Sequence, residues 1–307
     1  MSESNRVEIK YVAESTYGTT PTNSAAWQAL RYLSNTLTGN PRTIVSNEIS
    51  STRQVTDLIL VGQEIGGDIN GEFSCNTYDD LIQAAMCGTW TADVLKVGTT
   101  DRSFSIEKKY ADWTTPQYLQ YKGMKVNTMA LNFAYGAVAT CGFGFAGKTH
   151  LSTTTSLLGS GSVVAATTTD VLNGSSDISG VEIDGVAPTS IVKSIGINLT
   201  NNLRAIEGVG ATGPQDQAYG RSLISGTIEM YFDDVAAYTK LLANTTATFE
   251  FTVGDGANSY TFLFPKIKFN SGAPEDGQLD GDVMQRIAFT ALYDSGEATS
   301  LKITRVP

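Results

Sequence analysis

The chain has 307 residues, of which 41% are hydrophobic and 17% are charged, a balance typical of a globular protein of about two domains. The formal charge of −10 with a single histidine disfavours tight binding of nucleic acid, because duplex DNA is itself strongly negative. No apolar run approaches the roughly 20 residues that span a bilayer, so we expect no membrane insertion.

The first ten residues, Met1 to Lys10, have no apolar core of the kind that a secretory signal needs. We therefore expect the chain to be made in a cytoplasm and to stay there unless a dedicated machine exports it. The three cysteines, Cys75, Cys87 and Cys141, are widely spaced and odd in number. They predict reduced, buried thiols, and neither a disulfide nor a zinc site is expected.

Short alternating apolar runs, separated by Gly, Asn, Asp, Ser and Thr, predict a mainly β protein. Residues 1–30 are expected to form an N-terminal arm. Within it, Val7 to Val12 alternate like a strand, and Gly18 and Pro21 then break regular structure.

The stretch 43–68 is long for a connection in a compact domain, which usually indicates a functional or a disordered segment. Its apolar residues, Ile44, Val45, Val55 and Leu58 to Val61, argue against disorder. We interpret it as a long hairpin that buries its apolar side against another subunit. An ordinary internal strand pair is the alternative.

The sequence from residue 69 onward contains an internal repeat. An alternating run from Ile69 leads to Asp79-Asp80, a helix-like segment and Gly88; another from Ile224 leads to Asp233-Asp234, a second such segment and Asn244. Asp79 and Asp233 are predicted to be helix N-caps, and Gly88 and Asn244 to end the helices. Metal or acid–base chemistry at these carboxylates is the less favoured reading.

Three further blocks repeat in the same order: 104–107 with 249–252, 118–127 with 261–270, and 139–146 with 285–293. The sequence thus predicts a first module at 31–148 and a second at 186–307. Residues 149–185, rich in Thr, Ser and Gly, are predicted to be a linker.

One motif resembles a nucleotide site. Gly142-Phe-Gly-Phe-Ala-Gly147-Lys148-Thr149 matches the P-loop pattern, but Phe143 and Phe145 alternate as in a strand, and the segment after Thr149 has poor helix propensity. We interpret the match as a coincidence. A nucleotide hydrolase that uses Lys148 remains an alternative, which a Lys148→Ala variant would test.

No other catalytic, cofactor or metal residues are predicted. His150, the single histidine, has no partnered nucleophile motif. The acidic loop 274–282 lacks the spacing and the terminal Glu of an EF-hand, so a solvated hairpin loop is expected there.

Several segments resemble the tail tube (major tail) proteins of long-tailed bacteriophages. The resemblance covers almost the whole chain and is weakest in the linker. The segments that carry it are Ser46-Asn47-Glu48-Ile49, Arg53-Gln54-Val55, Asp57-Leu58, Gly66-Gly67-Asp68, Tyr78-Asp79-Asp80-Leu81, Leu95-Lys-Val97, Asn198 to Arg204, Asp282-Val283-Met284-Gln285 and Ala291-Leu292-Tyr293-Asp294.

The resemblance implies two tandem β-sandwich or barrel-like modules, each with a short flanking helix. It implies rings that stack into a hollow tube in the virion tail, through which DNA passes without specific binding. It assigns the arm and the 43–68 hairpin to contacts between subunits and rings. The docking candidates are Asn47, Glu48, Arg53, Gln54, Val55, Asp57 and Leu58.

Two modules in one chain predict a ring of three chains with pseudo-six-fold symmetry, in preference to a ring of six chains with one module outside. By resemblance, the other partners are tape-measure, tail-tip and tail-terminator proteins. A secretion-apparatus tube and a surface-displayed β-sandwich binding module are the remaining alternatives.

Overall fold

The computed structural model describes residues 3–21, 25–277 and 279–307. Residues 1–2 and 22–24 of the predicted arm, and Gln278 of the acidic loop, lie outside the described residues. The prediction of a mainly β fold is confirmed, with sheets that are layered and not closed into a barrel. In the part of the chain that is described, no helix has the length and hydrophobicity to span a bilayer.

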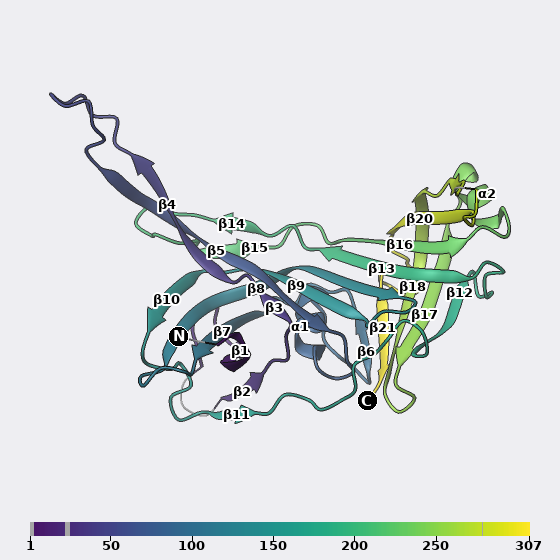
Figure 1. The fold of residues 1–307 in the computed structure, drawn as a ribbon, viewed down its shortest axis with the longest axis horizontal. Helices are drawn as coiled ribbons and strands as arrows, with labels where there is room; N and C mark the ends of the chain where they lie inside the picture. The colour runs from purple at the N-terminus through teal and green to yellow at the C-terminus, as the bar shows by residue number, and fades with distance from the viewer. Residues whose placement is uncertain (1–2, 22–24, 278) are drawn as a thin grey trace.

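Elements up to residue 146 form the first half of the molecule (Figure 1). They are η1 (Ser4–Arg6), β1 (Val7–Glu14), β2 (Ala26–Ala29), β3 (Ser34–Asn35), β4 (Thr38–Val45), β5 (Leu58–Glu72), α1 (Asp79–Ala85), β6 (Val94–Lys96), β7 (Ser103–Tyr110), β8 (Gln117–Ala134) and β9 (Thr140–Ala146).

Of the remaining elements, the first two pair with strands of the first half, and the others build the second half and the hairpin that crosses over the first. They are β10 (Thr149–Thr153), β11 (Ser162–Val164), β12 (Ile178–Ile183), β13 (Val192–Thr200), β14 (Arg204–Ile206), β15 (Asp216–Ala218), β16 (Leu223–Tyr231), α2 (Ala236–Ala243), β17 (Ala247–Gly254), β18 (Ser259–Ser271), β19 (Pro274–Glu275), β20 (Met284–Ala291) and β21 (Lys302–Val306).

The two halves repeat the same antiparallel pairing. In the first half β4 pairs with β5, β5 with β9, β9 with β8, β8 with β7 and β10, and β7 with β1. In the second half β13 pairs with β16, β16 with β20, β20 with β18, β18 with β17 and β21, and β17 with β12. Strand for strand, the order is the same.

Irregularities in the pairing recur at matching places. The register of β7 with β8 shifts between Phe104 and Ile106, and that of β17 with β18 shifts between Ala247 and Phe249. The register of β8 with β9 shifts after Val126, and that of β18 with β20 shifts after Phe269. Bulges are specific structural features, so this coincidence fixes residue-level equivalences between the halves.

These equivalences confirm part of the predicted alignment and correct another part. Blocks 118–127 and 261–270 align as predicted, with Lys125 equivalent to Lys268. In the first block, however, Ile69 is equivalent to Ile228 and not to Ile224. The shift of four residues is even, so it keeps each side chain on its face of the sheet, and the alternation alone could not reveal it.

The halves are joined by more than the predicted linker. β8 and β13 form seven antiparallel residue pairs, from Thr128↔Thr200 to Ala134↔Ser194. β6 of the first half also pairs with β21 of the second. A single apolar core runs through both halves, so the modules share their interior.

Residues predicted to be an arm and a linker lie within the folded body. β1 pairs along its length with β7 and buries Ile9 and Tyr11, so this part of residues 1–30 does not project. In the linker, β10 pairs with β8, β11 pairs with β2, and Leu172 is buried. β10 and β12 occupy equivalent places to β21 and β1, so the repeat extends into the predicted linker at both of its ends.

Candidate functional site

The most prominent surface feature is a hairpin of β4 and β5 that projects from the body (Figure 1). We call residues 41–63 the projecting hairpin. The docking candidates Asn47, Glu48, Arg53, Gln54, Val55 and Asp57 lie in its tip loop, and Leu58 begins β5. Every residue from 47 to 61 is exposed.

Apolar side chains of the projecting hairpin have no cover in the single chain. Ile49 is fully exposed, Val55 is 70% exposed, and Ile44, Leu58, Ile59, Leu60 and Val61 are exposed as well. Isolated apolar surface residues are ordinary, but a contiguous apolar ribbon usually marks an interaction surface. The projecting hairpin therefore has the composition of a segment that another chain covers.

A second hairpin, residues 201–222, is the equivalent of the first. β14 and β15 pair Ala205 with Gln217, as Val45 pairs with Leu58 in the projecting hairpin. Asp216 precedes Leu223 by seven residues, as Asp57 precedes Glu64. Leu223 in β16 and Glu64 in β5 occupy equivalent positions in the repeat. This covering hairpin leaves its own half and lies over the first half (Figure 1).

Lys125 holds the covering hairpin in place. Its ammonium donates to Asp101 Oδ2 at 2.7 Å, to Asp216 Oδ1 at 3.1 Å and to the carbonyl oxygen of Gln217 at 2.9 Å. The rings of Tyr17 and Tyr219 lie 4.6 and 5.3 Å from the same nitrogen. Only 1% of the Lys125 side chain is exposed, so these contacts replace its hydration.

Further polar contacts fix the base of the covering hairpin. Asn201 donates from Nδ2 to the carbonyls of Ala85 and Val126, and the amide of Leu203 donates to Asn127 Oδ1 at 2.9 Å. Gln217 donates from Nε2 to the carbonyl of Gly147. The joint between the halves thus combines strand pairing with a hairpin that is hydrogen-bonded across it.

Strands β4, β5, β9, β8, β13, β16, β20 and β18 form one continuous sheet across both halves, which we call the long sheet. One face is apolar and buried: a single row across it reads Gly71, Cys141, Leu131, Ile197, Gly226, Phe289 and Phe269. The strands alternate, so the next row points the other way.

The opposite face of the long sheet is polar. One row reads Asn70, Gly142, Ala130, Asn198, Ser225, Thr290 and Lys268, and the next reads Glu72, Thr140, Asn132, Gly196, Thr227, Ala288 and Ser271. We call this surface the polar face. Small uncharged residues predominate in these two rows, with Glu72 and Lys268 as the charged exceptions.

Both ends of the long sheet are open in the single chain. Among the described residues, no strand pairs with the outer edge of β4, and Lys268 to Ser271 of β18 pair only with β20. By the repeat, this edge of β18 is equivalent to the edge of β8 that carries β13. Unpaired edges invite further strands, so the open ends are complementary surfaces.

Comparison with known families decides what these surfaces belong to. A family model described as phage tail tube protein matches residues 4–291, nearly the whole chain and parts of both halves. The chain belongs to the phage tail tube protein family. It is therefore a structural component of a phage tail, and its family is not an enzyme family. A comparison with curated proteins finds no match.

The predicted helix caps of this tail tube protein differ from the structure. Asp79 is the first residue of α1, and the residue before the helix is Tyr78. The Asp79 carboxylate instead pairs with Arg305 and accepts from Tyr260 Oη, both in the second half. α2 begins at Ala236, and Asp234, not Asp233, accepts from its amide at 2.8 Å. The predicted stop at Asn244 is present, as a left-handed C-cap.

The P-loop match lies in a strand–turn–strand arrangement. Gly142 to Ala146 belong to β9 and Thr149 begins β10, so no helix follows the glycines. The Lys148 ammonium lies 5.1 Å from the centre of the Tyr17 ring. His150 packs on Tyr121 with 4.9 Å between ring centres, and burial lowers the pKa of its imidazole. Neither residue faces a partner suited to catalysis among the described residues.

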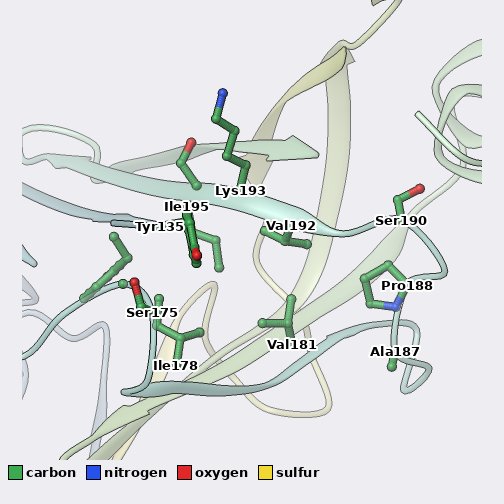
Figure 2. Close-up of a pocket in the computed structure, with 13 residues that line it drawn as sticks. Tyr135, Ser175, Ile178, Val181, Ala187, Pro188, Ser190, Val192, Lys193 and Ile195 are labelled. Carbon is green, nitrogen blue, oxygen red and sulfur yellow. The ribbon is translucent and has the colours of Figure 1, made fainter. Parts of the chain in front are cut away.

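A cavity of about 310 Å³ opens between β13 and the crossing segment 174–190 (Figure 2). Its wall is formed by apolar side chains such as Ile178, Val181 and Ile195, and Lys193 directs its ammonium away from it (Figure 2). The lining contains no carboxylate, histidine or cysteine. In the described part of the tail tube chain, no cluster of His, Cys, Asp and Glu is suited to a metal ion either.

Sequence reasoning located the projecting hairpin but missed the Lys125 clamp and the covering hairpin. The signal was present in the predicted repeat, because the blocks that end in Met-Lys125-Val-Asn and Ile-Lys268-Phe-Asn place the two lysines opposite each other. Nothing in either block distinguishes a buried lysine from an exposed one. Asp216 and Gln217 of the covering hairpin, which help to bury Lys125, lie about 90 positions further along the chain.

Proposed function

We propose that this protein assembles into closed rings of three chains, which stack into the hollow tube of a phage tail. One observation carries the proposal. The two halves repeat one pairing pattern and join through β8 and β13, while the equivalent edges at the two ends of the long sheet are unpaired. A second copy of the chain can supply the missing strand at each end.

The same joint, used between chains, gives the ring its symmetry. The β18 edge of one copy would receive β4 of the next copy, as β8 receives β13 within the chain. Heterologous contacts of this kind form closed rings when the rotation per unit divides a full turn. The resemblance to tail tube proteins implies a six-fold ring. Three chains supply the six equivalent halves of such a ring.

The polar face suits the inner wall of such a tube. Its Asn, Ser, Thr, Gly and Ala residues offer few fixed positive charges to DNA phosphates, so DNA would slide along the wall without being held. The apolar face is already buried in the core and cannot serve this purpose. We therefore place the polar face toward the lumen and assign to the tube the passage of genomic DNA.

Stacking of rings is assigned to the tip of the projecting hairpin. Asn47, Glu48, Arg53, Gln54 and Val55 lie there, exposed and away from the body. The other partners are those that the resemblance implies: tape-measure, tail-tip and tail-terminator proteins, with assembly in the host cytoplasm.

Negative-stain electron microscopy of the concentrated full-length protein, with rotational averaging of end-on views and mass measurement of single rings, tests the proposal. We expect hollow stacked rings with a mass of three chains and six similar lobes. Six chains per ring, with one half of each chain outside the wall, would contradict the trimeric ring. Protein that remains monomeric when a tail-tip initiator complex is supplied would contradict tube formation.

A further inference from the structure

The projecting and covering hairpins share a register but differ in what they contact. The covering hairpin extends past its own half and is bound to the half beside it through Lys125. The projecting hairpin extends past the first half in the same manner, but the single chain places no half beside it (Figure 1). The contact that binds the covering hairpin therefore predicts an equivalent contact for the projecting hairpin, which the single chain does not supply.

The residues of that contact can be read from the repeat. Lys125 in β8 is equivalent to Lys268 in β18, because both precede the shared bulge by one residue. Asp216 of the covering hairpin is equivalent to Asp57 of the projecting hairpin. Their local geometry also agrees. The Asp216 carboxylate accepts from the amide of Gln217 at 2.7 Å, and the Asp57 carboxylate accepts from the amide of Leu58 at 2.7 Å.

Lys125 and Asp216 are partners in an ion pair, whereas the equivalent residues Lys268 and Asp57 have no such partner in the single chain. Lys268 is only partly covered, and its ammonium makes no hydrogen bond or ion pair with any described residue. Asp57 is exposed, and its carboxylate contacts only the amide of its neighbour. A lysine and an aspartate that stand where a buried ion pair stands in the other half are complementary in charge and in position.

We propose that Lys268 of one copy binds Asp57 and the Leu58 carbonyl of the next copy in the same ring, as Lys125 binds Asp216 and the Gln217 carbonyl within the chain. The inference rests on the proposed ring and adds its partner residues. Leu58 and Leu60, which are exposed, take the places of Gln217 and Tyr219 and become covered in this contact.

The contact divides the projecting hairpin into two parts. Its base, residues 57–61, closes the joint between neighbours in one ring, whereas its tip, residues 47–55, extends further and stays available for the next ring. Exposed apolar residues lie in both parts, at Leu58 to Val61 in the base and at Ile49 and Val55 in the tip. Each part therefore has apolar surface to bury.

A charge exchange in the full-length protein tests the pair. Lys268→Glu and Asp57→Lys are made singly and together, and the protein concentration for half-assembly is measured by sedimentation, with electron microscopy of the pellets. We expect each single variant to raise that concentration at least about tenfold, because like charges then meet in a covered joint. The double variant should return to within about threefold of the wild type.

Lys266→Glu, two residues before Lys268, and Asp170→Lys, at an exposed position outside both hairpins, are matched controls for the change of charge and should leave ring formation unchanged. Circular dichroism and the thermal midpoint of each dilute variant should equal those of the wild type, since neither Lys268 nor Asp57 has a partner there. Single variants that form rings like the controls, or a double variant as defective as the singles, would overturn the pair while leaving the ring intact. Wild-type protein that forms no ring under any condition would overturn the proposed function and this contact together.

Discussion

Lys125 occupies a position where a lysine is costly without partners, since burial removes the hydration of its ammonium group. Three oxygen acceptors and two tyrosine rings replace that hydration. Two of the acceptors belong to the covering hairpin, so the lysine is satisfied only when the hairpin is in place. Lys268 has the same position in the repeat and remains partly exposed.

Truncation of the two lysines should therefore have unequal effects on the unassembled protein. We expect Lys125→Ala to lower the free energy of unfolding by about 2–4 kcal/mol, because several charge-assisted hydrogen bonds are lost together. Lys268→Ala should change it by less than about 0.5 kcal/mol, the usual range for a surface substitution. Urea unfolding of dilute protein, followed by circular dichroism, measures both values. Equal losses would show that Lys268 already has a buried role in the single chain.

Single residues were the least predictable part of the molecule. Asp79 has the sequence context of a helix cap, yet its carboxylate pairs with Arg305, which lies 226 positions away. The cysteines, in contrast, behave as predicted: all three are free and buried, and burial raises the pKa of the Cys141 thiol to about 12. Burial of a small apolar thiol follows from local alternation, whereas an ion pair depends on how distant strands meet.

At the scale of elements, the two hairpins show how one motif serves two purposes. The covering hairpin carries Gln217 and Tyr219 where the projecting hairpin carries Leu58 and Leu60, and only the former residues are covered in the single chain. A hairpin whose partner lies in the same chain becomes covered when the chain folds. One whose partner is another molecule stays apolar and exposed until assembly.

Shortening the projecting hairpin should separate folding from assembly. Residues 44–59 are replaced by Asn-Gly, a two-residue turn that suits the pairing of Thr43 with Leu60. The unassembled variant should keep its circular dichroism spectrum and its thermal midpoint to within a few degrees, because all the removed residues except the half-buried Ser46 are exposed. It should form no stacked tubes in electron microscopy. Tubes of normal length from this variant would refute a docking role for the hairpin.

Strand pattern and repeat order were readable from the sequence because alternation and turn residues are local properties. The projecting hairpin was recognisable from Leu58 to Val61, a run too apolar for a solvated loop. The covering hairpin was not, since Arg204, Gln217 and the glycines around it resemble an ordinary surface connection. Its role depends on the half of the molecule that lies beneath it, which no local pattern describes.

At the scale of the whole molecule, the register of the proposed joint between copies follows from β8 and β13. Thr128 pairs with Thr200 within the chain, and the equivalent residues are Ser271 and Asn40. These two residues lie at opposite ends of the long sheet, so they cannot meet within one chain. Paired residues of antiparallel strands have Cα atoms about 4.5–5.5 Å apart, which suits a disulfide.

Oxidation of assembled Asn40→Cys/Ser271→Cys protein should therefore give covalent trimers as the largest species on a denaturing, non-reducing gel. The native cysteines are buried and should not interfere. Asn40→Cys/Glu275→Cys is the matched control. Ser271 pairs with Ala288 of β20 and Glu275 with Met284, four residues further along β20, so the second thiol is displaced by about 13 Å. Cross-linking of the control instead of the test pair would show another register, and a ladder reaching six chains would show a hexameric ring.

The seven residue pairs between β8 and β13 also affect how readily a ring closes. Each separate association costs translational and rotational freedom, of the order of 4–15 kcal/mol. In the proposed ring three of the six joints form within a chain, where the tethered halves meet at an effective concentration in the millimolar range or higher. Only three encounters remain, so partial rings should be rare, and a tail could grow from a small pool of free protein.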